Sequence, residues 1–309
     1  MLQAVMADIA QLPDHSVVTT LEAALLNSFD NSGHGEVIAV ESPAQEAMVF
    51  QQLLQQVDAA LIIAPETGGI LADRCRQVLA ARVASWNCTP AAIELCGDKW
   101  QLANHLRTRD LPTIPTRLAD LDRLPSDESW PLVLKPRDGA GSHLIFLVRS
   151  PEEWQRAVES IRAAEGVEKC LVQPFVAGRA LSIGVNISHD GRRIVCLPVG
   201  EQRLSDDGRF HYLGGIIPAS IAPVVAQSIE RLVLEACQSI PGLVGYIGLD
   251  LLLTADGNLL IVEINPRLTT AYVGYRQLYA AMLPRLWNSA NPSDVLGVQR
   301  RMEVEFVVS

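Results

Sequence analysis

The pattern of apolar and polar residues along this chain changes near residue 95. Before it, short apolar runs predict strands, and longer segments with apolar residues three or four apart predict helices. The predicted strands cover 17–21, 36–40 and 59–64, and the predicted helices cover 43–57 and 70–83. This alternation is typical of an open sheet with helices on its faces, so residues 1–95 are expected to form a Rossmann-like α/β lobe. The chain opens with a predicted helix, which means that the usual first strand is missing or lies upstream.

Two further lobes are predicted beyond this boundary. Residues 96–168 begin with a helix that Asp98 caps and that runs to about 109, and they form a small central lobe. Its other predicted elements are strands 132–136 and 144–148, a turn at 137–142 and a helix at 151–164. Residues 169–309 are richer in strands and are expected to form an antiparallel-sheet lobe. Its strands are predicted at 170–173, 181–188, 193–198, 245–253, 259–265 and 302–308, with a helix at 221–240. The fold class is therefore α/β, with α+β lobes.

The most informative segment joins two apolar runs through Asp256-Gly257. Aspartate and glycine tolerate the positive φ angles of a two-residue hairpin turn, so this pair predicts the turn and, with it, the strand register. Counting outward from the turn places Asp250 directly opposite Glu263. Asn265 and Arg267 share that face of the second strand, because side chains alternate along a strand.

Two facing carboxylates inside apolar strands repel each other unless a cation lies between them. Asp250, Glu263 and Asn265 offer oxygen ligands alone, which favours Mg²⁺ or Mn²⁺ over zinc or copper. Mg²⁺ commonly completes its shell with water and phosphate oxygens, so this sparse set implies a bound nucleotide. An acidic, solvent-exposed hairpin face is the simpler alternative. Arg267 could neutralise a transferring phosphoryl group or pair with Glu263.

Nitrogen donors for phosphates are found in a second segment. Lys135 ends an apolar strand immediately before a glycine-containing turn, where a buried lysine would face an anion. Backbone N–H groups of the turn 138–142 could bind phosphate oxygens, although an ordinary hairpin has the same composition. Lys99 lies in the first turn of its helix, where the helix dipole does not favour a cation, so its two interpretations are a phosphate ligand and a solvated surface lysine.

Composition narrows the class of protein. The 309 residues are 49% hydrophobic, carry a net charge of −10 and show no internal repeat, so nucleic acid and anionic membranes are disfavoured partners. No signal peptide or membrane-length apolar run is present, and the cysteines have no metal-type spacing. We therefore expect a cytoplasmic protein with reduced, packed thiols at Cys75, Cys88, Cys96, Cys170, Cys196 and Cys237.

In order and spacing, these motifs resemble the ATP-grasp superfamily over about residues 86–275. The resemblance rests on Asp98-Lys99, Lys135 to Ser142, Gln173-Pro-Phe-Val176, and Asp250 with Glu263-Ile-Asn-Pro-Arg267. Within the superfamily, Ala64-Pro-Glu66, Asn87, 91–99 and 212–218 look most like the tyramine–glutamate ligase group of methanofuran-type cofactor biosynthesis. The resemblance implies a carboxylate–amine ligase that uses ATP and Mg²⁺ and forms an acyl phosphate. It also implies small-molecule carboxylate and amine substrates, and a homodimer as one possible assembly.

The same resemblance assigns roles by position. Lys99 and Lys135 would hold nucleotide phosphates, and Arg267 would steady the γ-phosphoryl group as the catalytic residue. Asp250, Glu263 and Asn265 would hold the metal. The loop that closes over the phosphates would be Gly139, Ala140, Gly141 and Ser142, and the hinge at adenine would be Gln173, Pro174, Phe175 and Val176.

The sequence departs from the family pattern at two positions. The ribose-binding Glu of many relatives is replaced by Ala180, and the hinge begins with Gln173 in place of an acid.

The residues that would bind the substrates remain open. For the substrate carboxylate, the cationic candidates besides Arg267 are Arg276, Arg203 and His211. An aromatic amine could lie among Tyr212, Tyr246, Tyr272 and Tyr275, although core packing is the simpler role for each of them.

Two functions from other classes compete with a ligase. A non-catalytic nucleotide-binding module is favoured by Ala180 but disfavoured by the retained metal and arginine positions. A dinucleotide oxidoreductase is excluded because Gly33 and Gly35 precede a predicted strand, whereas a dinucleotide-binding motif requires a helix there.

Overall fold

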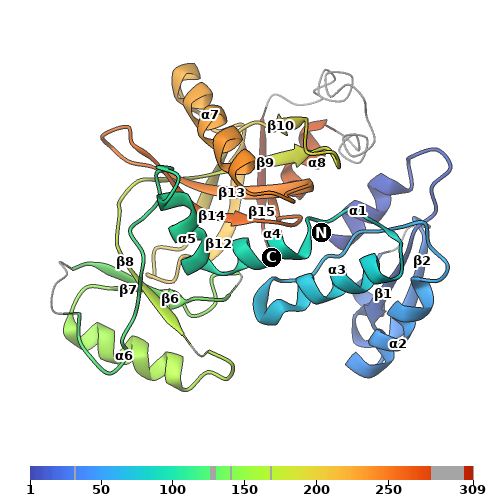
Figure 1. Cartoon of the computed structure of the whole chain (residues 1–309), viewed down its shortest axis with the longest axis horizontal. Helices are drawn as coiled ribbons and strands as arrows, with labels where there is room; N and C mark the ends of the chain where they lie inside the picture. The colour runs from blue at the N-terminus through green and yellow to red at the C-terminus, as the bar shows by residue number, and fades with distance from the viewer. Residues whose placement is uncertain (31–32, 126–129, 140, 168, 280–302, 309) are drawn as a thin grey trace.

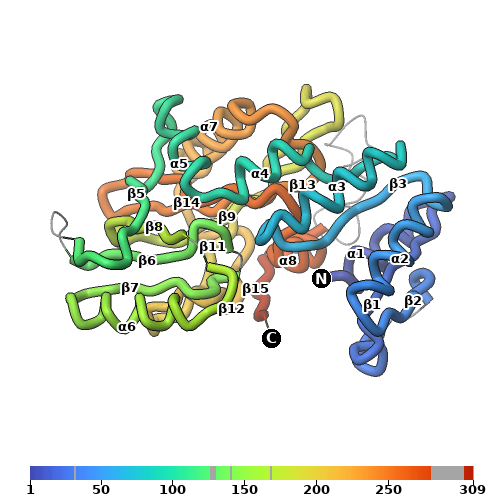
Figure 2. The backbone as a smooth tube through the Cα atoms, turned by 60° about the horizontal axis from the view of Figure 1, so that its bottom comes forward, coloured from blue at the N-terminus to red at the C-terminus, as the bar shows by residue number. Residues whose placement is uncertain are grey.

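The computed structural model describes residues 1–30, 33–125, 130–139, 141–167, 169–279 and 303–308. Three groups of elements are arranged along its longest axis (Figure 1). The N-terminal strands and helices lie at one end, a small sheet with α6 lies at the other, and a large antiparallel sheet lies between them. Figure 2 shows the same arrangement after rotation, with β5–β8 stacked on α6 and the N-terminal elements set apart.

The N-terminal elements form two separate pairs of parallel strands. Strand β1 (Val18–Glu22) pairs with β2 (Glu36–Val40), and β3 (Ala59–Ala60) pairs with β4 (Ala84–Ser85). The helices of this region are α1 (Leu2–Ile9), α2 (Pro43–Leu53) and α3 (Ile70–Ala80), with 3₁₀ turns at Ala23–Ser28 and Thr67–Gly69. The prediction of one open sheet is therefore only partly correct. Strand β3 ends at residue 60 and not at 64, and no ladder among the described residues joins the two pairs.

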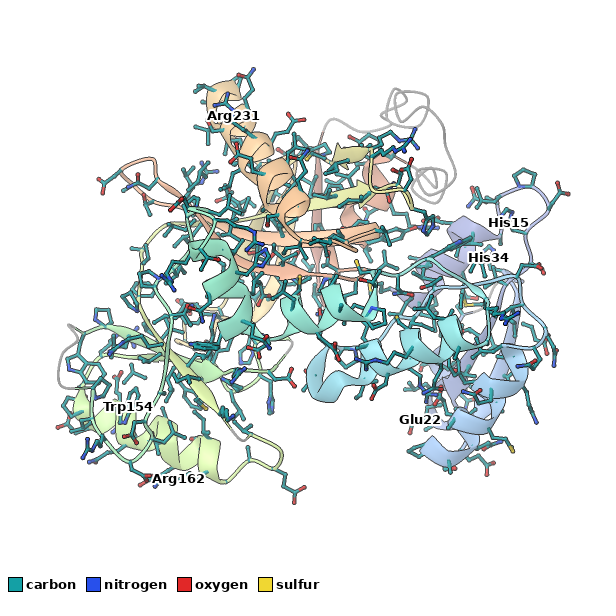
Figure 3. The ribbon with its side chains drawn as sticks, in the orientation of Figure 1. His15, Glu22, His34, Trp154, Arg162 and Arg231 are labelled. Carbon is teal, nitrogen blue, oxygen red and sulfur yellow. The ribbon has the colours of Figure 1, made fainter. Side chains whose placement is uncertain are left out.

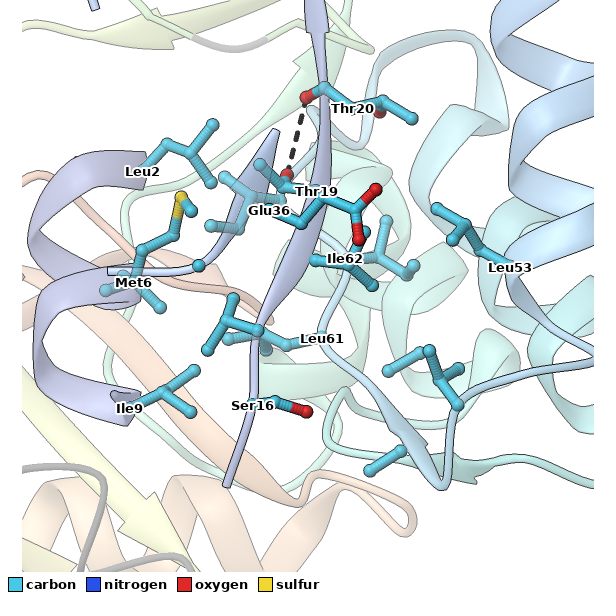
Figure 4. A pocket seen from close by; sticks show the side chains of 18 of the residues that line it. Leu2, Met6, Ile9, Ser16, Thr19, Thr20, Glu36, Leu53, Leu61 and Ile62 are labelled. Carbon is cyan, nitrogen blue, oxygen red and sulfur yellow. Dashed lines mark hydrogen bonds between the residues drawn. The ribbon is translucent and has the colours of Figure 1, made fainter. Parts of the chain in front are cut away.

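A cavity of about 1060 Å³ lies between these two strand pairs. Figure 4 shows Leu2, Met6 and Ile9 of α1 on one side of it, and Leu61 after β3 packs with the same cluster as Ile9. Thr19, Thr20 and Glu36 of the first pair border it as well. The residues that line this cavity include none of the predicted site residues, so it is separate from the carboxylate hairpin.

Two consecutive helices connect the N-terminal elements to the small sheet. The first, α4 (Pro90–Gly97), has Thr89 as its N-cap, and the sequence did not indicate it as a separate helix. The second, α5 (Lys99–Arg107), begins as predicted at Asp98, whose carboxylate accepts hydrogen bonds from the N–H groups of Trp100 and Gln101. This cap fixes the first turn of α5, and with it the position of Lys99.

The small sheet has the strand order β5-β8-β6-β7, and every ladder in it is antiparallel. Its elements are β5 (Arg117–Leu118), β6 (Leu132–Pro136), β7 (Phe146–Val148), β8 (Cys170–Pro174) and α6 (Pro151–Arg162). Trp154 and Ile161 of α6 pack with Leu134 and Phe146 of the sheet in one buried cluster. Trp154 and Arg162 lie at the opposite end of the molecule from His15 and His34 (Figure 3).

The large sheet has the order β14-β13-β9-β11-β12-β15, with β10 paired to β9. Its strands are β9 (Arg179–Ile187), β10 (Ile194–Cys196), β11 (Gly200–Leu204), β12 (Tyr212–Ile217), β13 (Gly245–Leu253), β14 (Leu259–Asn265) and β15 (Val304–Val307). Its helices are α7 (Pro223–Ser239) and α8 (Ala271–Tyr279). The sequence did not predict β11, β12 or α8. The predicted closing strand 302–308 corresponds to β15, and its first residue, 302, lies outside the described residues.

The main apolar core joins this sheet to α3, α4, α5 and α7. The six cysteines are free, and five of them are buried while Cys196 is half-buried, so the prediction of packed thiols is confirmed. Within the described ranges, no helix combines the length and apolar character that a membrane crossing requires.

Candidate active site

The hairpin between β13 and β14 places Asp250 opposite Glu263, as predicted, but through a different register near the turn. Leu253 pairs with Leu259 and Leu251 with Ile261, and the N–H of Thr254 donates to the carbonyl of Asn258. The loop that closes the hairpin therefore has three residues, 255–257, and Gly257 has a φ angle of +81°. The prediction of a two-residue turn is therefore wrong by one residue. A β-bulge at Val262 inserts one extra residue in β14 and restores the predicted pairing farther along the strand.

Polar side chains converge around this pair. Asn265 donates from Nδ2 to Asp250 Oδ2 at 3.2 Å and to Glu263 Oε1 at 3.4 Å. From β11, Gln202 donates from Nε2 to Asp250 Oδ1 at 2.9 Å. Gln202 was missed from the sequence because its strand was not predicted. The two amides supply the positive ends of their dipoles to two carboxylates that otherwise repel each other.

The charge of this cluster is only partly compensated. Burial and the neighbouring Glu263 raise the pKa of Asp250 well above its ordinary value. Burial alone would also raise the pKa of Glu263, but Lys99 and Lys135 hold it below its ordinary value. The pair thus lacks a full counter-charge, which is the condition that a divalent cation relieves.

The donor set fits a hard cation. It consists of two carboxylates and one amide. Elsewhere in the described residues, no cluster of three or more His, Cys, Asp and Glu side chains offers a competing set of metal ligands. Oxygen ligands at this low number suit Mg²⁺ or Mn²⁺ that takes its remaining ligands from water and phosphate. Asn265 would have to turn its amide so that Oδ1, and not Nδ2, faces the ion.

Two lysines face the carboxylates from different elements. Lys135, at the end of β6, is 5% exposed, and burial together with repulsion from Lys99 lowers its pKa to about 8. Lys99 Nζ lies 3.9 Å from Glu263 Oε2 and donates a hydrogen bond to the carbonyl of Gly139. Both lysines predicted to hold phosphates therefore lie at the carboxylate cluster, between the small sheet and the large one.

The glycine-containing loop is held from three directions. In addition to the Lys99 bond at Gly139, Asp138 accepts a 2.8 Å hydrogen bond from the backbone N–H of Gly68, and Ser142 Oγ donates to the carbonyl of Phe210 at 2.7 Å. Gly141 and Ser142 have φ angles of +67° and +59°. Ala140 lies outside the described residues. The loop thus spans the segment between β6 and β7, where the sequence predicted a phosphate-covering turn.

The predicted hinge follows from β8 into the large sheet. Gln173 is buried and donates to Thr116 Oγ1 at 2.7 Å, while the N–H of Phe175 donates to the carbonyl of Pro131. The Phe175 ring stacks on Phe210 with centroids 6.3 Å apart. Pro174 ends β8, and half-buried Val176 follows it. Ala180 lies in β9 opposite Leu252, where it offers no polar atom to a ribose.

Arg267 follows β14 and makes a contact that the sequence did not indicate. Its Nε donates to Glu66 Oε2 at 2.8 Å, so the pairing with Glu263 considered above is not the one formed. Glu66 lies after β3 in the N-terminal region. Its only sequence signal was its place in the Ala64-Pro-Glu66 resemblance, which gave it no role.

The remaining substrate candidates do not lie together. Arg276 of α8 donates from Nε to Asp8 of α1 at 2.7 Å, and Asp8 also accepts from Tyr272 Oη at 2.8 Å. Arg203 pairs with Glu305, and exposed His211 donates its N–H to Ser205 Oγ. Tyr246, Tyr272 and Tyr275 are buried in one cluster, with Tyr212 packed against it. The structure therefore favours core packing over an aromatic slot for these tyrosines.

A family model described as an ATP-grasp domain matches residues 96–271, and a pre ATP-grasp 3 domain model matches residues 15–93. Because the first of these models covers more than half of the sequence, the chain belongs to the ATP-grasp family.

Particular relatives refine this class. Tyramine–L-glutamate ligase of Methanocaldococcus jannaschii is 24% identical over 84% of this chain and 72% of its own length. The enzyme of the same name from Methanocaldococcus fervens is 26% identical over 78% of this chain and 70% of its own. D-alanine–D-alanine ligase of Streptomyces griseus is 28% identical over 53% of this chain and 41% of its own. These relatives and the family model identify an enzyme of the carboxylate–amine ligase type.

Solved structures show the same fold. The biotin carboxylase domain of Hydrogenobacter thermophilus 2-oxoglutarate carboxylase, in complex with MgADP, superposes with a TM-score of 0.77 at 16% identity, over 97% of this chain and 68% of that one. An ADP complex of N5-carboxyaminoimidazole ribonucleotide synthetase gives a TM-score of 0.75 at 17% identity, over 93% of this chain and 74% of that one. At these identities the likeness concerns the fold alone, and it confirms the predicted ATP-grasp architecture.

Proposed function

We propose that this chain uses ATP and Mg²⁺ or Mn²⁺ to join glutamate to tyramine or a similar aromatic amine, as in methanofuran-type cofactor biosynthesis. The observation that carries the proposal is the Asp250–Glu263 pair with Lys99, Lys135 and Arg267 close to it. The names of the two Methanocaldococcus relatives support the substrates.

The chemistry begins with activation of a carboxylate, which is a poor electrophile at neutral pH. A substrate carboxylate oxygen attacks the γ-phosphorus of ATP, the bond to the bridging oxygen breaks, and ADP leaves. Lys99 and Lys135 bind phosphate oxygens, and Arg267 offsets charge on the transferred phosphoryl group. Asp250, Glu263 and Asn265 would hold the metal, which supplies Lewis-acid charge stabilisation when bound. In the second step the amine nitrogen attacks the acyl carbon, the C–N bond forms, and phosphate leaves.

A product screen tests this proposal. The protein is incubated with Mg²⁺–ATP, tyramine and each amino acid singly, ADP is quantified, and products are identified by mass. We expect ADP release and a tyramine amide with glutamate. Phosphate release without any amide product across a panel of amines would refute the proposal that the protein joins an amine to an amino acid. The absence of ADP release would refute the ligase proposal as a whole.

A second substrate pair is also supported. The similarity to D-alanine–D-alanine ligase covers about half of this chain, so an amino acid could serve as the amine. The same screen separates the two possibilities, because a dipeptide product with tyramine omitted would replace the tyramine assignment. A homodimer stays a prediction, and light scattering on the purified chain would decide it.

A further inference from the structure

Glu66 brings the N-terminal region to the proposed phosphoryl site. It lies at the beginning of the 3₁₀ turn after β3, and its side chain is 9% exposed. The 2.8 Å bond from Arg267 Nε ties it to the residue proposed to steady the γ-phosphoryl group. A carboxylate in direct contact with that arginine lies next to the place where the acyl phosphate would form.

The loop that carries Glu66 is fixed in position by packing and hydrogen bonds. The N–H of Gly68 donates to Asp138 of the glycine-containing loop at 2.8 Å. Gly68 and Gly69 both have positive φ angles, +64° and +72°, which glycine adopts without strain. A side chain at Gly97 would meet Glu66 Cβ at 3.0 Å, so α4 packs directly against the stem of this glutamate. Residue 66 is therefore fixed between the phosphate loop and Arg267.

The proposed reaction needs a group that removes a proton from the amine. An alkyl amine has a pKa of about 10 and enters as an ammonium ion, whose nitrogen has no free electron pair. The other carboxylates near the site already have partners: Asp250 and Glu263 share the predicted metal, and Asp98 forms an ion pair with Arg137. Glu66 differs from them because its partner, Arg267, has a second use in the reaction.

We propose that Glu66 binds the ammonium group of the incoming amine and accepts its proton. This inference rests on the proposed ligase function. As Arg267 engages the transferred phosphoryl group, Glu66 becomes available to the ammonium ion. One N–H bond of the ammonium breaks, and the proton moves to a Glu66 carboxylate oxygen. The nitrogen lone pair forms the C–N bond to the acyl carbon, the carbon–oxygen bond to phosphate breaks, and the departing phosphate takes the second proton that the nitrogen loses.

A pair of nucleophiles tests this role. Glu66→Gln keeps the size of the side chain and an oxygen that accepts from Arg267, but it cannot take a proton. Hydroxylamine is neutral at neutral pH, so it captures an acyl phosphate as a hydroxamate without a base. We expect Glu66→Gln to retain ADP release and hydroxamate formation within a few-fold, and to lose amide formation with the amine by about a hundredfold or more.

Three controls accompany the variant. Glu94→Gln makes the same change at an exposed glutamate of α4 that pairs with Arg76, and it should leave both products unchanged. Glu66→Asp keeps a carboxylate and should recover part of the amide rate. Raising the pH should restore amide formation in Glu66→Gln, since more of the amine is already neutral. Burial raises the thiol pKa of both Cys88 and Cys96, which pack near Glu66. Lys135 has a pKa of about 8 and loses charge over the same pH range, so the amide rate is measured at saturating ATP and compared with hydroxamate formation at each pH.

Each outcome decides between named alternatives. Equal losses of hydroxamate and amide in Glu66→Gln would show that Glu66 only positions Arg267, and unchanged amide formation would show that it has no role. Either result overturns the inference and leaves the ligase proposal intact. If the wild-type protein forms neither product and releases no ADP with any carboxylate, the proposed function itself fails, and the inference fails with it.

Discussion

At the scale of single residues, the proposed activity depends on two acids, Asp250 and Glu263, that face each other across the hairpin. Asp250→Asn removes one charge from the pair and one metal ligand, so we expect activity to fall by about a hundredfold or more. The folded protein loses a repulsion, so its thermal midpoint in the absence of metal should stay level or rise. Glu263→Gln should act similarly on activity. Melting curves and ADP release measure the two effects.

The matched control for this pair lies in the same hairpin. Asp256→Asn changes an exposed carboxylate of the loop, and it should leave turnover unchanged. Full activity in Asp250→Asn or Glu263→Gln would refute the metal assignment.

Lys135 gives a pH dependence at the same scale. Its folded pKa of about 8 lies below the ordinary value of 10.5, so the fraction that carries charge falls as the pH rises through 8. Phosphate binds the protonated form, and affinity for ATP should therefore weaken above that pH, by at most about tenfold per pH unit. Calorimetric titrations from about pH 7 to about pH 9 measure this. Lys135→Arg stays charged throughout and should show a flat profile, whereas an equally flat profile in the wild-type protein would remove Lys135 from phosphate binding.

At the scale of elements, the bulge in β14 decides whether the acids meet. Inserting one alanine between Ile261 and Val262 leaves the pairing near the turn unchanged but moves Val262 opposite Asp250, so that Glu263 turns to the other face of the sheet. We expect metal-dependent activity to be lost while far-UV circular dichroism retains the sheet signal. Deleting Ala255 shortens the loop beyond the paired strands and should preserve activity. Equal activity of the insertion variant and the deletion variant would show that the register is not what brings the ligands together.

The same hairpin shows what a sequence can and cannot predict. The two apolar runs on either side of Asp256-Gly257 predicted the strands 245–253 and 259–265 with correct ends, because strands that pack in the core are rich in apolar residues. The bulge could not be predicted, since Val262 only lengthens the apolar run 259–262 by one residue and leaves the local pattern unchanged. The Asp250–Glu263 pairing was correct because the error at the turn and the bulge cancel. Strand β11 has the polar sequence Gly-Glu-Gln-Arg-Leu, so Gln202 could be found only from the fold.

At the scale of the whole molecule, the N-terminal region is tied to the large sheet and its helices by charged contacts between residues far apart in the sequence. Asp8 of α1 is fully buried and bonded to both Tyr272 and Arg276 of α8, and Glu66 is bonded to Arg267. No local pattern reveals such pairs, because each partner alone is an ordinary polar residue. For this reason Arg276 was taken as a substrate candidate from its sequence position, whereas its geometry favours a structural role.

This structural role is testable. Arg276→Met leaves Asp8 buried without its cation, which should destabilise the fold by about 3 kcal/mol, with no rise in KM for the carboxylate substrate. Arg203→Met, at an exposed pair with Glu305, should change stability by about 1 kcal/mol or less. Denaturant titrations and initial rates measure both quantities. A raised KM with unchanged stability would return Arg276 to the substrate site.

The central claim is that the lysines, the arginine and the carboxylate pair activate a carboxylate by phosphorylating it. Transfer of a heavy oxygen isotope tests this most directly. The carboxylate substrate is labelled at both oxygens, the enzyme turns over with unlabelled ATP, and the released phosphate is analysed by mass. We expect one labelled oxygen in each phosphate, because the bond between the acyl carbon and that oxygen breaks when the amine attacks. Amide formation that yields only unlabelled phosphate would contradict the central claim.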